Sequence, residues 1–225
     1  MVAINGVQRV FLILLGAPGT GKGTQAQMLA EKEGWLHVST GDMLREAVTS
    51  RTILGEAAKK YMEQGALVPD TLVISMLVER IGRPDAMDGL ILDGFPRNLA
   101  QAKALDEALK TAGRCVDMAI NIAVPDEELV KRLSGRWMCR NCGRIYNVSA
   151  GLPDKCERCG GELYQRDDDK AETVKARISK QKPPAEMMEH YRLAGKLTDI
   201  NGLQPVEGVT AQMQAVLSEH KGQRA

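Results

Sequence analysis

The sequence predicts an α/β protein built on a doubly wound, parallel sheet of five strands. Short apolar runs alternate with amphipathic stretches along most of the chain, as in successive strand–helix units. The first run is apolar at every position, which is typical of a strand buried on both faces of a parallel sheet. Four runs are well bounded and the fifth is weaker: Val10–Leu15, Leu36–Val38, Leu90–Leu92, Val116–Ile122 and Leu197–Ile200.

Helical segments are expected between and after these strands, because their apolar residues recur at intervals of three and four. Turn residues, acidic first turns and prolines suggest where they begin and end. In chain order, the expected helices are Lys22–Glu33, Gly41 to Leu67 with breaks at Gly55 and Gly65, Asp70 or Thr71 to Ile81, Gln101–Leu109, a helix opened by Pro125 and Asp126, Asp167 to Lys180 with a stop at Pro183 and Pro184, and Val209–Leu217.

The composition bounds the class of protein. The 225 residues include 30 basic and 29 acidic side chains and only 4% aromatics, so a general nucleic-acid or membrane-surface binder is not indicated. The apolar run Val10–Leu15 is too short for a secretion signal or a membrane span, and a cytoplasmic protein is expected. Cys115 falls in an apolar stretch and is expected to be a buried strand thiol.

Residues 16–24, GAPGTGKGT, follow the first strand and open a helix. Gly16, Gly21 and Lys22 satisfy the GxxxxGK pattern in the strand–helix context that a nucleotide phosphate loop requires. Its backbone N–H groups and the helix N-terminus attract phosphate, and Lys22 can reach the terminal phosphates. The residue after Lys22 is Gly23 rather than Ser or Thr, so Thr24 is the nearest hydroxyl for a magnesium ion that would otherwise be held by nucleotide and water.

Basic residues cluster around the predicted carboxyl ends of the strands. The segment Ser39–Arg45 follows the second strand, and the segment Leu92–Arg97 follows the third. Arg132 and Arg136 share a helix face because they are four residues apart. A single arginine is usually solvated surface. A crevice that gathers all of them would suit phosphoryl transfer, which needs positive charge around a polyanion: Arg45, Arg97, Arg132, Arg136, Arg166 and Arg177.

The motifs GAPGTGKGTQA, STGDMLR, LDGFPRN and YQRDDDKAETVKAR resemble adenylate kinases from Val10 to Leu217. The resemblance implies the P-loop nucleoside monophosphate kinase fold, with a core of 1–38, 69–135 and 167–225. It also implies an AMP-binding insert at 39–68 and a lid at 136–166, both of them mobile. The implied reaction is reversible phosphoryl transfer from MgATP to AMP, giving two ADP, in a monomer that binds neither nucleic acid nor membrane.

Carried over to this numbering, the resemblance also implies site residues. The ATP site would comprise Gly19, Thr20, Gly21, Lys22, Gly23, Thr24, Arg132, Arg136, Ile145, Tyr146 and Gln204. The AMP site would comprise Thr40, Arg45, Ala66, Leu67, Val68, Gly94, Arg97, Gln101, Arg166 and Arg177. The residues acting on the transferring group would be Lys22, Arg97, Arg132, Arg136, Arg166 and Arg177, with Asp93 orienting Mg²⁺ through water.

Four cysteines form two CxxC pairs separated by thirteen residues: Cys139, Cys142, Cys156 and Cys159. In a reducing compartment this spacing predicts a closed tetrahedral metal site of the structural type. Zinc is expected, although iron or cobalt would fit four thiolates, and reversible disulfides or spare thiols are the alternatives. The stretch from Trp137 to Leu163 has little core of its own, so a metal could supply its folding free energy.

Two other functions remain open from the residues. A kinase for another nucleoside monophosphate, such as UMP/CMP, would share the phosphate loop, although Thr40 and Gln101 favour adenine. A P-loop ATPase carrying a zinc ribbon could bind nucleic acid, but the near-neutral charge and few aromatics argue against it.

Overall fold

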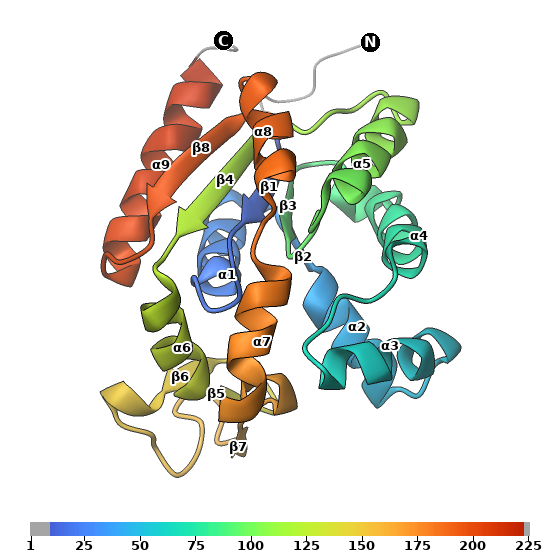
Figure 1. Cartoon of the computed structure of the whole chain (residues 1–225). Helices are drawn as coiled ribbons and strands as arrows, with labels where there is room; N and C mark the ends of the chain where they lie inside the picture. The colour runs from blue at the N-terminus through green and yellow to red at the C-terminus, as the bar shows by residue number, and fades with distance from the viewer. Residues whose placement is uncertain (1–9, 223–225) are drawn as a thin grey trace.

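The computed structural model describes residues 10–222, in which a five-stranded parallel sheet lies between two layers of helices (Figure 1). All four neighbouring strand pairs are parallel, as predicted. Across the sheet the order is β2 (Leu36–Ser39), β3 (Leu90–Asp93), β1 (Phe11–Leu15), β4 (Met118–Ala123) and β8 (Leu197–Asn201).

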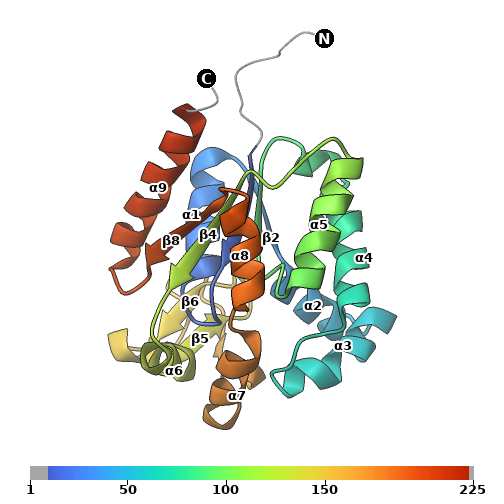
Figure 2. The ribbon, with the colours of Figure 1, turned by 45° about the horizontal axis from the view of Figure 1, so that its top comes forward.

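Alternation along β1 assigns its side chains to two separate cores. Phe11, Ile13 and Leu15 belong to the larger core, under α4 (Asp70–Ile81), α5 (Leu99–Thr111) and α8 (Ala185–Leu193). Leu12 and Leu14 belong to the other core, under α1 (Lys22–Glu33) and α9 (Val206–Gly222). Figure 2 shows these two groups of helices on opposite faces of the sheet. The first strand is therefore buried on both faces, as its uninterrupted apolar run predicts.

The strand order switches sides at β1. The strands β2 and β3 lie on one side of it, with β3 as its neighbour, and the chain then crosses to β4 on its other side. In open α/β sheets, the crevice outside the carboxyl ends of the strands at such a point is where ligands bind. The turn from β1 to α1 lies at this edge. Figure 1 shows α2, α3 and the three short lid strands around the same end of the sheet.

The segment after β2 corrects one detail of the prediction. It forms α2 (Thr40–Thr49) and α3 (Ile53–Glu63), with the break at 50–52 rather than at Gly55. The Thr52 hydroxyl accepts a hydrogen bond from Gly55 N at 3.0 Å and so caps α3. A Cβ at Gly55 would collide with the Ala47 carbonyl, so glycine at this position allows close packing of two helices rather than ending one.

The cysteine-bearing stretch contains a small antiparallel sheet that the sequence did not predict. Its order is β6 (Ile145–Asn147), β5 (Arg136–Cys139) and β7 (Leu163–Tyr164). It lies between α6 (Asp126–Ser134) and α7 (Ala171–Gln181). Asp167–Asp169 form a separate 3₁₀ turn rather than the start of α7. Only Cys139, Cys156 and Leu163 are buried within this sheet's cluster, which is a very small core.

The predicted stop at Pro183 and Pro184 is confirmed, since α7 ends at Gln181. A new helix, α8, which the sequence pattern did not predict, starts directly after Pro184, which acts as its N-cap. Proline tolerates this position because the first N–H groups of a helix have no intrahelical partner. The prediction of a buried strand thiol at Cys115 was wrong, because Cys115 is exposed and lies outside β4, which begins only at Met118. Among residues 10–222, no helix has the length and apolar character needed to cross a membrane.

Candidate active site and metal centre

A cleft of about 500 Å³ lies at the carboxyl ends of β1, β2 and β3. Its wall combines the phosphate loop with side chains from α2, the lid strands and α7. Six cationic side chains from six separate parts of the chain face this one space: Lys22, Arg45, Arg97, Arg136, Arg166 and Arg177. The carboxylates of Asp42 and Asp93 also line it. Such a concentration of positive charge suits a ligand that carries several negative charges.

The phosphate loop has the conformation that its motif predicts. Gly21 adopts φ +97°, a left-handed geometry favoured by glycine, and α1 begins at the next residue. The Lys22 ammonium donates hydrogen bonds to the carbonyls of Gly16 and Ala17, both at 2.8 Å. Burial lowers the pKa of Lys22 to about 8, against an opposing effect of Asp93 and with a smaller contribution from Arg97. The loop is therefore already shaped around a cation.

Asp93 ends β3 beside the phosphate loop. Its carboxylate lies 3.8 Å from His37 Nε2, on the neighbouring strand β2. Burial would raise the pKa of Asp93, but His37 and Lys22 outweigh burial and hold the pKa below its ordinary value. The carboxylate therefore stays ionised at neutral pH, as a group that orients a cation or its water must.

The lid arginines are held by acidic partners. Arg136 donates two hydrogen bonds, both of 2.7 Å, to the fully buried carboxylate of Asp169, which also accepts one from Arg177. Arg166 lies 3.4 Å from Asp42, a residue of α2. This last contact joins the segment between β7 and α7 to α2, and both of its residues line the cleft. Burial lowers the pKa values of Arg166 and Arg177, the former to about 10.

A narrower slot of about 50 Å³ opens beside the cleft, towards α3 and α5, and shares Arg45, Arg97 and Arg177 with it. The other predicted AMP-site residues along the slot are Thr40, Ala66, Leu67, Val68, Gly94 and Gln101. Several of these groups are fixed by hydrogen bonds. Arg97 Nε donates to the Gly94 carbonyl at 2.7 Å, and Gln101 is buried and donates to Asp70 at 2.6 Å. The slot is thus a mixed apolar and polar pocket, with several of its polar groups held by hydrogen bonds, beside a strongly basic cleft.

Comparison with known proteins decides the family. The sequence model described as adenylate kinase matches residues 14–196, which is most of the chain. The chain belongs to the adenylate kinase family. It is 52% identical over 214 residues to the adenylate kinase of Archaeoglobus fulgidus, covering 93% of this chain and 99% of that protein. The adenylate kinases of Methanothrix thermoacetophila and Thermodesulfovibrio yellowstonii are 47% and 46% identical, each over 92% of this chain and at least 98% of theirs.

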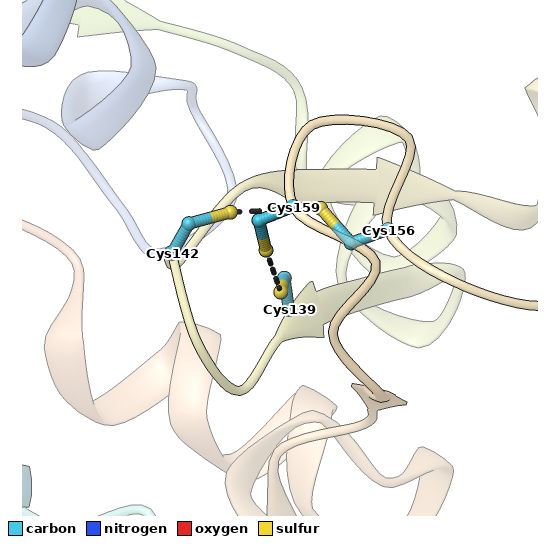
Figure 3. A group of neighbouring side chains, drawn as sticks. All are labelled: Cys139, Cys142, Cys156 and Cys159. Atoms are coloured by element: carbon cyan, nitrogen blue, oxygen red, sulfur yellow. Dashed lines mark hydrogen bonds between the residues drawn. The ribbon is translucent and has the colours of Figure 1, made fainter.

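The lid of this adenylate kinase family member brings its four cysteines together (Figure 3). All four sulfurs lie within 4.8 Å of one another, and the closest pairs are Cys139–Cys159 at 3.4 Å and Cys142–Cys156 at 3.5 Å. A tetrahedral zinc–thiolate site would place its sulfurs about 3.8 Å apart, given zinc–sulfur bonds of about 2.3 Å. The donor set and spacing therefore fit a metal ion of the structural type. A hydrogen bond from Tyr146 lowers the pKa of Cys156 to about 6, which favours the thiolate.

The metal cluster adjoins the nucleotide cleft. Cys142 and Gly143 of the first CxxC turn line the cleft together with Met138 and Ile145. One wall of the cleft is therefore made by the same turn that supplies two of the metal ligands.

Four of the residues that the family resemblance implies lie outside the lining of both the cleft and the slot. Thr20 turns its hydroxyl to the Ala17 carbonyl, and Arg132 pairs with Glu128 at 2.9 Å on α6. Tyr146 directs its hydroxyl towards Cys156, and Gln204 lies in the turn before α9.

Other residues belong to the cleft but were given no role in the sequence analysis. His37 and Gln181 line it, and Gln181 bridges Arg97 at 2.7 Å and the Gly65 carbonyl at 2.8 Å. Its position, one turn after Arg177 on α7, was the available signal. Asp42 and Asp169 lie inside the recognised motifs, but their pairing with arginines depends on contacts between distant parts of the chain.

Proposed function

We propose that the chain catalyses reversible transfer of the terminal phosphoryl group of MgATP to AMP, giving two ADP. The observation that carries the proposal is the sharing of Arg45, Arg97 and Arg177 between the phosphate-loop cleft and the adjoining slot. Two mononucleotides bound in these spaces would direct their phosphates at one group of guanidinium ions. Membership of the adenylate kinase family supports the same reaction.

The proposed chemistry needs no general base. The phosphate of AMP is already an anionic nucleophile, so its oxygen can attack the terminal phosphorus of ATP in line as the bond to ADP breaks. The reaction then depends on placing the two phosphates and on neutralising charge in the transition state. Lys22 and the arginines of the cleft supply this charge, and magnesium bound to ATP shares it.

On the acceptor side, Arg45 and Arg97 would bind the AMP phosphate, assisted by Arg166 and Arg177. Thr40 and Gln101 would lie near the adenine, with backbone at 66–68 and Gly94 completing the pocket. The slot supports this assignment because Thr40 and Gln101 are buried at its edge, where a polar base edge needs partners.

On the donor side, the loop from Gly19 to Thr24 would hold the ATP phosphates. Arg136, Arg166 and Arg177 would neutralise the transferring group, and Arg132 with Ile145, Tyr146 and Gln204 would form the base and ribose pocket. Gly23 provides no hydroxyl for magnesium, so the ion would be held by ATP, water and Thr24, with Asp93 orienting the water. In support, Thr24 and Asp93 both line the cleft.

We further propose that residues 39–68 and 136–166 close over AMP and ATP to exclude water, around a core of 1–38, 69–135 and 167–225, and that opening limits turnover. The Arg166–Asp42 contact supports closure because it joins the two segments directly. A cytoplasmic, monomeric enzyme that binds neither nucleic acid nor membrane completes the proposal.

The function is tested by a coupled assay of ADP formation from MgATP with AMP, GMP, CMP or UMP as acceptor. We expect AMP to be preferred by at least about tenfold in kcat/KM, since a pocket that hydrogen-bonds its substrate discriminates strongly against the wrong base. Preference for CMP or UMP would assign the chain to a different acceptor. Tight, salt-sensitive DNA binding without phosphoryl transfer would instead revive the nucleic-acid alternative.

We propose that the four cysteines hold structural zinc. Removal of the metal by a chelator is expected to lower the melting temperature, because the lid cluster has few buried side chains to hold it together. The value of kcat with saturating nucleotides should change little, since no cysteine takes part in the transfer. Differential scanning calorimetry before and after verified metal removal checks this, and zinc restoration is the control. An unchanged melting temperature would contradict a structural role.

A further inference from the structure

The two CxxC turns of the lid have nearly the same backbone geometry. Gly143 N donates to the Cys139 carbonyl at 3.0 Å, and Gly160 N donates to the Cys156 carbonyl at 2.7 Å. Both glycines adopt φ +70°. Each turn therefore folds a CxxCG segment so that its two sulfurs face the same point. The similarity indicates that the two turns would bind one metal ion equivalently.

The turns differ in what supports them. The first turn connects two paired strands, because Cys139 ends β5 and β6 begins at Ile145. The second turn, 156–160, has a strand on one side only, since residues 148–155 directly before it form a 3₁₀ turn and a loop, while β7 starts at Leu163. Cys156 N donates to the Gly161 carbonyl at 2.9 Å, as Cys139 N does to Arg144, but no strand pair continues the second turn as β5 and β6 continue the first.

Tyr146 makes up for part of this difference. It lies on β6, opposite Trp137 of β5, and its hydroxyl donates to Cys156 Sγ at 3.3 Å. The same hydroxyl oxygen accepts a hydrogen bond from Glu157 N at 2.9 Å. Because the oxygen accepts the peptide N–H, its own hydrogen is left to point at the sulfur. One hydroxyl group thus fixes both the backbone and the sulfur of the second turn.

The surroundings keep the ring of Tyr146 in place. It is half-buried against the cysteine cluster. The Arg144 guanidinium lies 5.5 Å from its centroid and 3.6 Å from the carboxylate of Glu157. The ring, its hydroxyl and the second turn are therefore linked by several contacts, so the position of the hydroxyl does not depend on one bond alone.

We propose that Tyr146 is a positioning residue of the metal centre, which orients Cys156 and donates a hydrogen bond to its sulfur when that sulfur binds the metal ion. Groups that hydrogen-bond to metal ligands fix the direction of the ligand and tune its basicity. The inference rests on the proposed metal site, but it does not depend on the phosphoryl-transfer reaction. It adds a role in metal binding to a residue whose family resemblance implies only contact with ATP.

The test measures Zn²⁺ affinity by competition with a chromophoric chelator, using the full chain. Tyr146→Phe removes only the hydroxyl and is expected to weaken Zn²⁺ binding by about 10- to 100-fold, the range found for groups that support metal ligands. Tyr164→Phe is the matched control, since Tyr164 lies on β7 of the same sheet beneath Arg140. Its Zn²⁺ affinity should equal that of the wild-type protein. Equal affinity of the Tyr146→Phe and wild-type proteins would overturn the proposal.

A second readout separates thiolate tuning from a merely structural effect. With Co²⁺ in place of zinc, loss of a hydrogen bond to sulfur should move the thiolate-to-cobalt charge-transfer band of Tyr146→Phe to lower energy. Full band intensity at saturating Co²⁺ would show that all four sulfurs still bind and that the lid is folded. A band unmoved from the wild-type position would refute the tuning.

The two proposals fail in different ways. Wild-type protein that binds neither Zn²⁺ nor Co²⁺ would overturn the metal site and the role of Tyr146 together, while ADP formation could still be intact. Wild-type binding with no effect of Tyr146→Phe would overturn the role of Tyr146 alone.

Discussion

Lys22→Met is expected to lower kcat/KM for ADP formation by about a thousandfold or more, equivalent to about 4 kcal/mol of transition-state stabilisation. Methionine keeps the length of the side chain but removes the charge that the loop holds at its centre. The ammonium lies 2.8 Å from each of two loop carbonyls, where a phosphate would replace them as its partner. No other cation of the cleft comes from the loop itself.

The fold should survive this substitution. Burial already lowers the pKa of Lys22, which means that the folded protein disfavours the charge and gains nothing in stability from it. The measurement is steady-state kinetics with a thermal melt of the same sample. Lys32→Met, an exposed position near the end of α1, is the matched control and should leave both unchanged. Turnover of Lys22→Met within a few-fold of wild type would show that the phosphates bind elsewhere.

Arg97→Ala is expected to lower kcat/KM by about 10²- to 10³-fold, equivalent to roughly 3–4 kcal/mol. The guanidinium is oriented by Gly94 and Gln181, each at 2.7 Å, and it faces both the cleft and the slot. Alanine would remove a preorganised positive charge from the point where the two nucleotides are proposed to meet. The loss should appear in the KM for AMP as well as in kcat, and the KM for ATP should change less.

Arg97→Ala should not lower the melting temperature of the nucleotide-free protein. Burial lowers the pKa of Arg97 to about 10, with a further effect of Arg177, so this charge is held at a cost to stability. Arg83→Ala, which breaks an exposed pair with Glu79, provides the control and should leave activity unaffected. A large fall in melting temperature would mean that Arg97 serves mainly to hold the fold together.

Local sequence signals predicted much of the fold and the shape of the site. Short apolar runs predicted the five strands, and the spacing of Gly16, Gly21 and Lys22 identified the phosphate loop, because both signals depend on neighbouring residues only. The family is confirmed by comparison with known proteins. The individual roles of the site residues stay predictions, supported by the shared lining of the cleft and slot.

The predictions failed where contacts between distant parts of the chain determine the local structure. The lid strands are only two to four residues long and are interrupted by Gly and Cys, which conceals their alternation. α8 was missed because Pro184 was interpreted as a stop, although proline suits a helix start equally well. Arg136 and Asp169 are 33 residues apart in the sequence, so no local sequence pattern predicts their pairing.

Acidic side chains paired with the arginines of the cleft have a consequence for how long a product stays bound. Asp42, Asp168 and Asp169 already neutralise part of the charge of the arginines. A polyphosphate that binds must therefore compete with these carboxylates for the arginines. When it leaves, the arginines can pair with the carboxylates again. A cleft of bare arginines would retain ADP far more tightly. The same exchange works in both directions, which suits a catalyst whose substrates and products carry nearly equal charge.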